Sequence, residues 1–414
     1  MNLFKYKDDT LFCEETSIPR LADEIGTPFY LYSKNTILRH FRRLDESLAG
    51  IDHIICYALK ANPSLAICKT LCHAGAGAEV VSGGELLRAL RVGIPPEKIV
   101  FNGNGKTEEE LTRALENHIL MINVDSESEL KLLDRIAGEM GRKAPVALRV
   151  NPDIDPRTHP YISTGLKENK FGIAIEQALE YYQEARELSN IEVVGVHKHI
   201  GSQIVELSPL VESLQKIMPL VNELKRLGFA LRYIDMGGGM GITYNDEEPP
   251  SFEEYVDAIR PMVKNSGCTL IVEPGRVLVG NAGILVTRVL HVKNSGQKTF
   301  VVVDAAMNDL VRPSVYKAYH KIIPVELRPD RKRIVADVVG GICESTDFFA
   351  RSRELPEVQQ GELIAIMSAG AYGSSMSSNY NSRPLIAEIM VDGTHTKVIR
   401  RRQTFEEMIA LESF

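Results

Sequence analysis

The sequence of 414 residues lacks several features that define common classes of protein. It contains no run of about 18 apolar residues, so no segment is predicted to span a membrane. Its 48 lysines and arginines stand against 55 aspartates and glutamates, a net charge of −7, so it has no basic surplus for a phosphate backbone. Internal repeats and low-complexity segments are also missing. These absences argue against a membrane protein, a nucleic-acid-binding protein and a repeat protein.

Cysteine is scarce and an export signal is not evident. The N-terminal residues, MNLFKYKDDTLF, contain neither an apolar run nor a small-residue cleavage site, so we expect no signal peptide. The six cysteines are therefore expected to be reduced thiols, and the protein to be cytoplasmic. A hydrophobic content of 44% and a chain of this length suffice for a folded core without disulfides.

Between about residues 33 and 277, short apolar runs alternate with amphipathic segments of helical periodicity. The runs predicted to be strands are 54–59, 78–81, 99–101, 120–124, 146–150, 193–197, 231–235 and 270–273. A helix over 35–48 precedes the first of them. Eight strands, each paired with a helix, favour an α/β fold of the closed (β/α)8 TIM-type barrel, with an open doubly wound sheet as the alternative.

After residue 278 the pattern changes to runs rich in valine and isoleucine, without long helices between them. Such runs predict an antiparallel β-sandwich domain. The first 30 residues could add a strand to this domain. We therefore expect an N-terminal segment over 1–30 that joins the β domain, a barrel over 31–277, and the β-sandwich over 278–414.

Functional residues of a (β/α)8 barrel lie at the C-terminal ends of its strands. This rule selects a short set of polar residues and glycine-rich turns from the sequence. The set comprises Lys60, Glu79, Arg149, His197, His199, Ser202, Asp235, Gly237, Gly238, Gly239, Glu273, Gly275 and Arg276.

Several of these residues suggest a particular chemistry, and each also has an ordinary structural explanation. Lys60 has apolar neighbours, and desolvation lowers a lysine's pKa enough to give the neutral amine of a Schiff base; a surface lysine would look the same. The run MGGGMG follows the seventh strand, where barrels often bind phosphate through backbone N–H groups. His197 and His199 could ligate zinc, pack in the core or stack on a flat cofactor. Glu273 could pair with a neighbouring side chain or keep a pyridine nitrogen protonated.

Polar loops in the second domain supply further candidates. Cys343 and Glu344 lie in GGICESTD, a polar setting that differs from the buried position typical of a lone cysteine. Arg312 and Tyr316 lie in RPSVY, and Tyr372 in GAYGSSMSSNYN. Loops often carry binding and catalytic residues.

Together these motifs make the sequence resemble the fold-type III pyridoxal-phosphate decarboxylases. The matching segments are YALKAN, EVVSGGEL, HKHIGSQI, DMGGGMG, EPGR, MNDLVRPSVYKAYH, GGICESTD and GAYGSSMSSNYNSRP, in the expected order. Within that family the similarity is to members that decarboxylate meso-2,6-diaminopimelate to L-lysine and CO2, the last step of this route to lysine. One departure is Glu79, where the family more often has aspartate, and the charge is kept.

The resemblance implies a homodimer with active sites at the interface, to which the β-sandwich domain contributes, and pyridoxal 5'-phosphate as the cofactor. It implies that Lys60 carries the cofactor, that His199 stacks on its ring, and that the partner subunit's Cys343 donates a proton. Metal, nucleic acid and membrane have no part in it. The cofactor-binding set is Lys60, Glu79, Arg149, His199, Ser202, Gly238, Gly239, Glu273, Pro274, Gly275, Arg276 and Tyr372.

The charge of the second-domain residues bears on the substrate. A decarboxylase for ornithine or arginine must bind a distal cation, whereas diaminopimelate presents a distal carboxylate and ammonium. Arg276 and Arg312, with Tyr316, could hold that carboxylate, and Glu344 the ammonium; Tyr372 completes the predicted substrate-binding set. The alternatives are a decarboxylase of the same fold for arginine, ornithine or carboxynorspermidine, a zinc hydrolase, and a binding protein that has lost the chemistry.

Overall fold

The computed structural model describes residues 2–166 and 170–413. The chain divides into two compact units. One contains residues 40–242 and 248–277, and the other contains residues 1–39, 243–247 and 278–414. No helix in the described part of the chain combines the length and apolarity needed to cross a bilayer.

The first unit is a closed barrel of eight parallel strands. The strands are β5 (His53–Ala58), β6 (Gly77–Val80), β7 (Ile99–Phe101), β8 (Met121–Val124), β9 (Ala144–Asn151), β11 (Ile191–His197), β12 (Tyr233–Asp235) and β13 (Thr269–Val272). Strand β8 pairs with β9 and β13 pairs with β5, which closes the ring, and the short β10 (Ile173–Ala174) adds to β9. The predicted barrel is thus confirmed over the open-sheet alternative.

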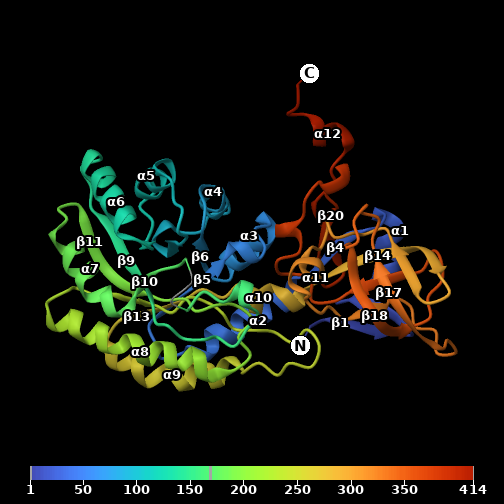
Figure 1. Ribbon diagram of the computed structural model, residues 1–414, viewed down its shortest axis with the longest axis horizontal. Coiled ribbons are helices and arrows are strands. Elements are labelled where there is room, and N and C mark those ends of the chain that lie inside the picture. Colours follow the sequence, from blue (N-terminus) through green and yellow to red (C-terminus); the bar gives the residue numbers. More distant parts are fainter. Residues whose placement is uncertain (1, 167–169, 414) are drawn as a thin grey trace. The chain divides into compact units, whose positions relative to one another are not determined.

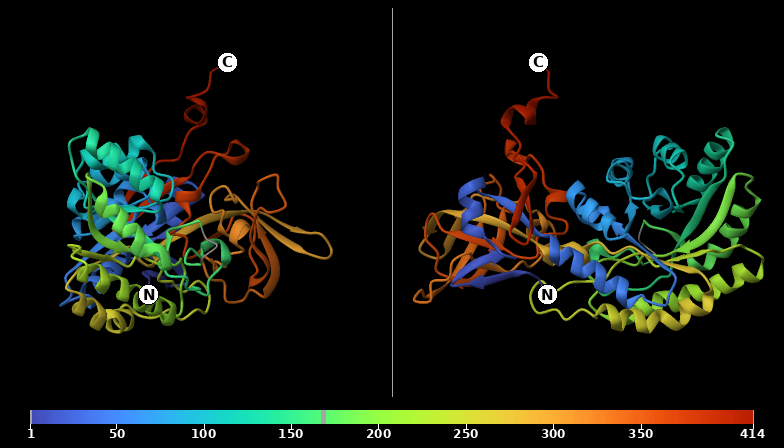
Figure 2. Two further views of the ribbon diagram at one scale, coloured as in Figure 1. Left: turned by 60° about the vertical axis from the view of Figure 1, so that its left-hand side comes forward. Right: turned by 180° about the vertical axis from the view of Figure 1, so that it is seen from behind.

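Helices surround the strands of the barrel (Figures 1 and 2). They are α2 (Lys34–Ser47), α3 (Leu65–His73), α4 (Gly83–Arg91), α5 (Glu108–Glu116), α6 (Glu127–Glu139), α7 (Ile175–Glu187), α8 (Leu207–Arg226), α9 (Phe252–Ser266) and the short α10 (Arg276–Val279). Local sequence explains several helix starts. Thr107 and Ser251 each form a capping box with the glutamate three residues on, which satisfies backbone N–H groups that the helix leaves open.

The barrel interior changes from apolar to polar along the strand direction. A buried apolar layer contains Cys56, Val100, Met121, Ala147, Val194 and Ile271. Toward the C-terminal ends, the buried side chains become polar: Glu79, Asn123, His197 and Asp235 are fully buried. Because all eight strands are parallel, their C-terminal ends share one mouth, and the polar residues gather there.

The second unit is built mainly from β-strands. The N-terminal part supplies β1 (Phe4–Lys7), β2 (Thr10–Cys13), β3 (Thr16–Ser17), α1 (Ile18–Ile25) and β4 (Phe29–Ser33). The C-terminal part supplies β14 (Gly283–Asn294), β15 (Thr299–Val303), α11 (Arg312–Tyr316), β16 (Ile322–Pro324), β17 (Arg333–Val339), β18 (Phe348–Pro356), β19 (Leu363–Ile366), β20 (Ala387–Asp392), β21 (His395–Arg400) and α12 (Phe405–Ile409).

These strands form a nine-stranded sheet and a three-stranded sheet, with a shared apolar core that includes Leu11, Leu31 and Ile389. The pairing is mostly antiparallel, as predicted. Two pairs differ, because β15 runs parallel to β17 and β4 runs parallel to β20.

Candidate active site

Lys60 lies just beyond β5, on a 3-10 turn over Leu59–Ala61 at the barrel mouth. Its Nζ donates to both carboxylate oxygens of Glu79, at 2.6 and 2.7 Å. Glu79 is fully buried on β6, whereas the Lys60 side chain is 35% exposed. Burial raises the pKa of Glu79, and the adjacent Lys60 opposes that rise. The arrangement holds an amine at a fixed position, where an incoming molecule can reach it.

Two asparagines connect Glu79 to the other carboxylates of the mouth. Asn102, the residue after β7, donates to Glu79 at 3.0 Å and to Glu273 at 2.6 Å. Asn123 on β8 donates to the side-chain oxygen Oδ1 of Asn102 at 2.6 Å and to Asp235 at 3.0 Å. Neither asparagine was predicted from the sequence, although both occupy strand-end positions where a buried polar residue is a signal of function.

The carboxylates of Asp235 and Glu273 differ in their proton affinity. Burial raises the pKa of Asp235 well above its ordinary value, and the charge of Glu273 adds to this. Burial acts in the same direction on Glu273, but His197 and the charge of Lys60 outweigh it and lower its pKa to about 2. Glu273 is therefore the anionic member of the pair.

His197 ends β11, and His199 follows two residues later. His197 is fully buried at the end of β11, with Nε2 3.7 Å from Glu273. His199 accepts a hydrogen bond at Nδ1 from the backbone N–H of Gly238, at 3.2 Å. Burial lowers the pKa of both imidazoles. Lys198 between them is also buried, and it donates to Ser213 of α8 at 2.7 Å.

The glycine-rich turn after β12 is one that larger residues could not form. A Cβ on Gly238 would lie 2.2 Å from the carbonyl oxygen of Glu273. Gly239 has a φ of +120°, which L-residues rarely adopt. After the next strand, β13, Arg276 donates to Ser202 Oγ at 3.0 and 3.3 Å. Close-packed backbone, a hydroxyl and a guanidinium form a set suited to an anion such as phosphate.

The remaining barrel residues of the predicted site also lie at strand ends. The β-sheet register places Arg149 beside His197, and its guanidinium lies 3.9 Å from Asp125 and over the ring of Phe171. The carbonyl oxygen of Pro274 accepts from the backbone N–H of Ala58 at 3.1 Å. A Cβ on Gly275 would lie 3.1 Å from the Cβ of Ala58, so this turn packs tightly on the end of β5.

The second unit contains the other predicted residues. Arg312 is buried at the start of α11, where its Nη1 lies 2.8 Å from His320 Nε2 and its guanidinium lies 4.6 Å from the ring centroid of Tyr244. Tyr316 ends the same helix and is half-buried. Tyr372 is half-buried with a φ of +55°.

Cys343 and Glu344 are exposed on a loop that Asp347 fixes. The Asp347 carboxylate accepts from the backbone N–H groups of Met307, at 2.7 Å, and Ile342, at 2.6 Å. Tyr380 donates to Glu344 at 2.8 Å, and the hydrogen bonds of Thr346 and Tyr380 lower the pKa of Glu344. All six cysteines are free thiols, and Cys343 is the exposed one among them.

The barrel residues fit pyridoxal phosphate by the chemistry of their groups. An aldehyde needs an amine, and Lys60 has one. A pyridinium needs an anionic partner, and Glu273 is an anion. A phosphate needs N–H and hydroxyl donors close to it, and the glycine turn, Ser202 and the backbone near Arg276 have them.

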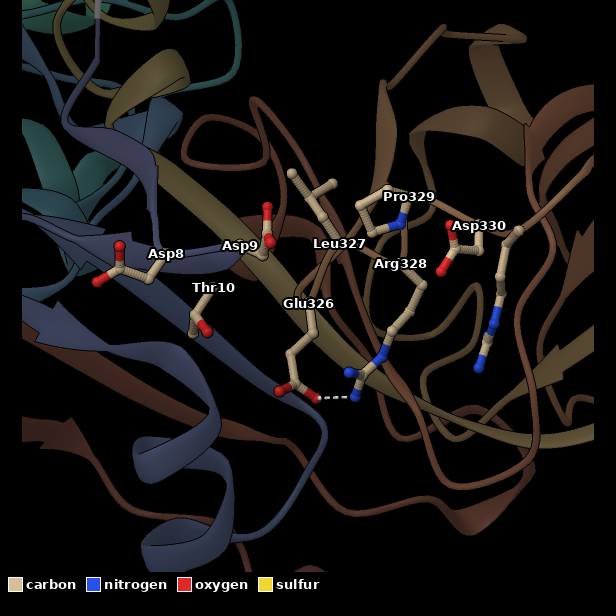
Figure 3. Close-up of a pocket in the computed structure, with 9 residues that line it drawn as sticks. Asp8, Asp9, Thr10, Glu326, Leu327, Arg328, Pro329 and Asp330 are labelled. Atoms are coloured by element: carbon tan, nitrogen blue, oxygen red, sulfur yellow. Dashed lines mark ion pairs between the residues drawn. The ribbon is translucent and has the colours of Figure 1, made fainter.

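The zinc hypothesis used His197, His199 and acidic residues at the strand ends. Within the described residues, the group compact enough to hold an ion is His197, Asp235 and Glu273, which contains two of those acids but not His199. A hollow in the second unit is lined by Asp8, Asp9, Thr10, Glu326, Leu327, Arg328, Pro329, Asp330 and Arg331 (Figure 3). None of the predicted site residues lines it.

Comparison with known proteins defines the class of protein first. The family described as "Pyridoxal-dependent decarboxylase, pyridoxal binding domain" matches residues 34–280, which span the barrel. The pyridoxal-dependent decarboxylases are thus the class to which the fold and the site residues point.

Full-length relatives narrow the class. The chain is 49% identical to the diaminopimelate decarboxylase of Aquifex aeolicus, covering 98% of this chain and 96% of the relative. It is 48% identical to the diaminopimelate decarboxylase of Pseudomonas aeruginosa, covering 100% of this chain and 99% of the relative. A crystal structure of diaminopimelate decarboxylase from Helicobacter pylori complexed with L-lysine has a TM-score of 0.92 and 45% identity, covering 95% of this chain and 98% of that one. The chain belongs to the diaminopimelate decarboxylase family.

Proposed function

We propose that this chain decarboxylates meso-2,6-diaminopimelate to L-lysine and CO2 with pyridoxal 5'-phosphate, the last step of lysine biosynthesis through diaminopimelate. The observation that carries the proposal is the contact of Lys60 with both oxygens of the buried Glu79, beside the anionic Glu273. In a chain of this family, that is an amine poised to bind an aldehyde opposite a carboxylate poised to bind a ring nitrogen.

Pyridoxal phosphate, when bound, supplies a ring that withdraws the electrons left at the α-carbon as CO2 departs. The chain's own residues prepare that ring. Glu273 keeps a proton on the ring nitrogen, and neutral His199 packs on the ring without adding charge. Glu79 orients Lys60 and accepts a proton from its Nζ. The glycine turn, Ser202 and the backbone N–H groups near Gly275 and Arg276 hold the phosphate, with Tyr372 and Arg149 completing the set. This leaves the Arg276 guanidinium for the substrate.

A proton must then replace CO2 at the α-carbon. A thiol S–H can donate one. The proposed donor is the partner subunit's Cys343, in a homodimer whose active sites lie at the interface. The exposure of the Cys343 and Glu344 side chains in this chain supports that assignment, because exposed groups are available to a second copy.

The distal end of diaminopimelate carries one carboxylate and one ammonium. Arg312, Arg276 and Tyr316 are proposed to bind the carboxylate, since the planar guanidinium matches its two oxygens. Glu344 is proposed to bind the ammonium, supported by hydrogen bonds that keep it ionised. On this proposal, residues 31–277 bind the cofactor and residues 278–414 contribute to the active site. Residues 1–30 belong with the β domain. The protein acts in the cytoplasm, which suits its free thiols.

Reductive trapping tests the cofactor assignment directly. The protein is loaded with pyridoxal phosphate and reduced with borohydride, and its peptides are mapped by mass spectrometry. We expect the phosphopyridoxyl group on Lys60 and its loss in Lys60→Ala, while Lys69→Ala, an exposed lysine on the nearby α3, keeps it. Labelling of a different lysine, or of none, would contradict the proposal.

A further inference from the structure

Asn102 stands between two carboxylates that have different proposed tasks. Its Nδ2 donates one hydrogen to Glu79, at 3.0 Å, and the other to Glu273, at 2.6 Å. Glu79 is the partner of Lys60, and Glu273 is the proposed partner of the ring nitrogen. One amide group therefore contacts both the carboxylate beside Lys60 and the carboxylate proposed to bind the ring nitrogen. Asn102 is itself 4% exposed, so water does not compete for these hydrogen bonds.

The hydrogen-bonding chemistry fixes the orientation of this amide. Carboxylates accept hydrogen bonds and do not donate them when ionised. If the Asn102 amide were flipped, its oxygen would face Glu79 and Glu273, and its NH2 would face the NH2 of Asn123. The observed orientation instead lets Asn123 donate to Asn102 Oδ1 at 2.6 Å. Asn123 is anchored in turn on Asp235, at 3.0 Å.

These contacts act on the charge of the carboxylates. A buried carboxylate without donors takes up a proton, because burial disfavours the charged form. The hydrogen bonds of Lys60 and Asn102 oppose the rise that burial causes in the pKa of Glu79. The same NH2 group also donates to Glu273, and such a hydrogen bond is stronger when the carboxylate is ionised.

We propose that Asn102 is a positioning residue, held by Asn123, that keeps Glu79 and Glu273 ionised and correctly oriented toward Lys60 and the ring nitrogen. The inference rests on the proposed function, since it concerns the same site. It assigns the two asparagines to the chemistry of the reaction rather than to substrate binding. Loss of the amide should reduce turnover more than it affects substrate affinity.

Two variants with side chains of nearly the same size test whether the hydrogen-bond donors of Asn102, rather than its bulk, are needed. Asn102→Leu removes both donors, and Asn102→Asp replaces them with a third carboxylate. Asn104→Leu, an exposed position in the same loop, is the matched control. Circular dichroism and thermal melting establish which variants fold, and Asn102→Ala, which adds no bulk, replaces any that does not.

Three measurements are made on each folded variant: kcat and KM for diaminopimelate, the affinity of the apoprotein for pyridoxal phosphate, and the ¹⁵N chemical shift of the ring nitrogen in labelled cofactor. We expect Asn102→Leu and Asn102→Asp to lower kcat roughly 10-fold or more, with little change in KM, since hydrogen bonds to charged groups are strong. The nitrogen shift should move toward the unprotonated ring, and cofactor affinity should fall. Asn104→Leu should match the wild type.

A wild-type nitrogen shift and kcat in the Asn102 variants would overturn the inference while leaving the proposed function intact. A rise in KM alone, with an unchanged shift, would also overturn it. Failure of the wild-type protein to bind pyridoxal phosphate or to turn over diaminopimelate is a different result, and would instead overturn the proposed function.

Discussion

Among single residues, Arg312 bears most directly on the choice of substrate. It is a buried cation held by two neighbours: Nη1 lies 2.8 Å from His320 Nε2, and the guanidinium lies over the ring of Tyr244. His320 Nδ1 lies 2.8 Å from the carbonyl oxygen of Met367, which must accept. Nδ1 therefore carries the hydrogen, and Nε2 accepts from Arg312. The guanidinium is thus held in one orientation before any substrate arrives.

Substituting Arg312 should therefore weaken substrate binding selectively. In Arg312→Ala, we expect the KM for diaminopimelate to rise roughly 10-fold to 100-fold, because charge-assisted hydrogen bonds to a carboxylate are lost. Arg312→Lys keeps the charge but not the planar fork, so its KM should be intermediate. Steady-state kinetics measure both variants. An unchanged KM in Arg312→Ala would remove this residue from the substrate site.

The strand-end rule explains which site residues could be predicted. Lys60, His199 and Glu273 were selected because each ends or follows a predicted strand, and Glu79 because it lies within one. Asn102 obeys the same rule but was missed, because its importance comes from two partners that are 23 and 171 residues away in sequence. Periodicity shows where a side chain points, but it does not show which other side chain it meets.

At the level of secondary-structure elements, the barrel was predictable and the sheet order of the second unit was not. All eight predicted barrel strands are present, and for most of them the ends differ by only one or two residues. Each is a short, mainly apolar run followed by a segment of helical periodicity, a pattern that sequence analysis detects well. The parallel pairs β15–β17 and β4–β20 join segments far apart in sequence, and no local pattern encodes their adjacency.

The junction of β11 and α8 supplies a prediction about stability. Burial of Lys198 lowers its pKa to about 7, although the charge of Asp235 acts in the opposite direction. An unfolded lysine titrates near 10.4, so between about pH 7 and about pH 10 the unfolded state binds more protons. Within that window, the free energy of unfolding should rise with pH, by on the order of 1 kcal/mol per unit from this residue. Below it, the folded state bears the full cost of a buried charge.

Lys198→Met removes this contribution. We expect the free energy of unfolding of the variant to exceed that of the wild type most near about pH 6 and least near about pH 9. Urea unfolding measures it at each pH. Lys69→Met, on the exposed surface of α3, should show the wild-type pH dependence. If the free energy of unfolding changes with pH equally in Lys198→Met and the wild type, Lys198 is charged in the folded protein over the whole pH range, which would contradict this prediction.

For the whole molecule, the central question is whether one active site draws on two chains. Lys60 and Cys343 belong to different compact units, and the proposal takes them from different subunits. Lys60→Ala and Cys343→Ala should each lose most turnover, and Cys343→Ala should still bind the cofactor. When subunits of the two variants exchange at random, about a quarter of all sites regain both native residues, since half of the dimers are mixed and half of their sites are intact.

Recovery to about a quarter of wild-type activity on mixing would therefore support a shared site. The matched control mixes Lys60→Ala with Glu273→Ala. Both changes lie in the barrel, so each mixed dimer would have one change in each site, and no recovery is expected. Equal recovery in the two mixtures would contradict a site built from two subunits.

The most direct test of the account is to follow the reaction itself. Purified protein with pyridoxal phosphate is given meso-diaminopimelate, ornithine or arginine in parallel, and the release of CO2 and the amine or amino-acid product are measured by mass spectrometry. The account predicts L-lysine from diaminopimelate and no turnover of the other two. Turnover of ornithine or arginine in preference to diaminopimelate would contradict the roles assigned to Arg312 and Glu344, and no turnover of any of them would contradict the proposed function.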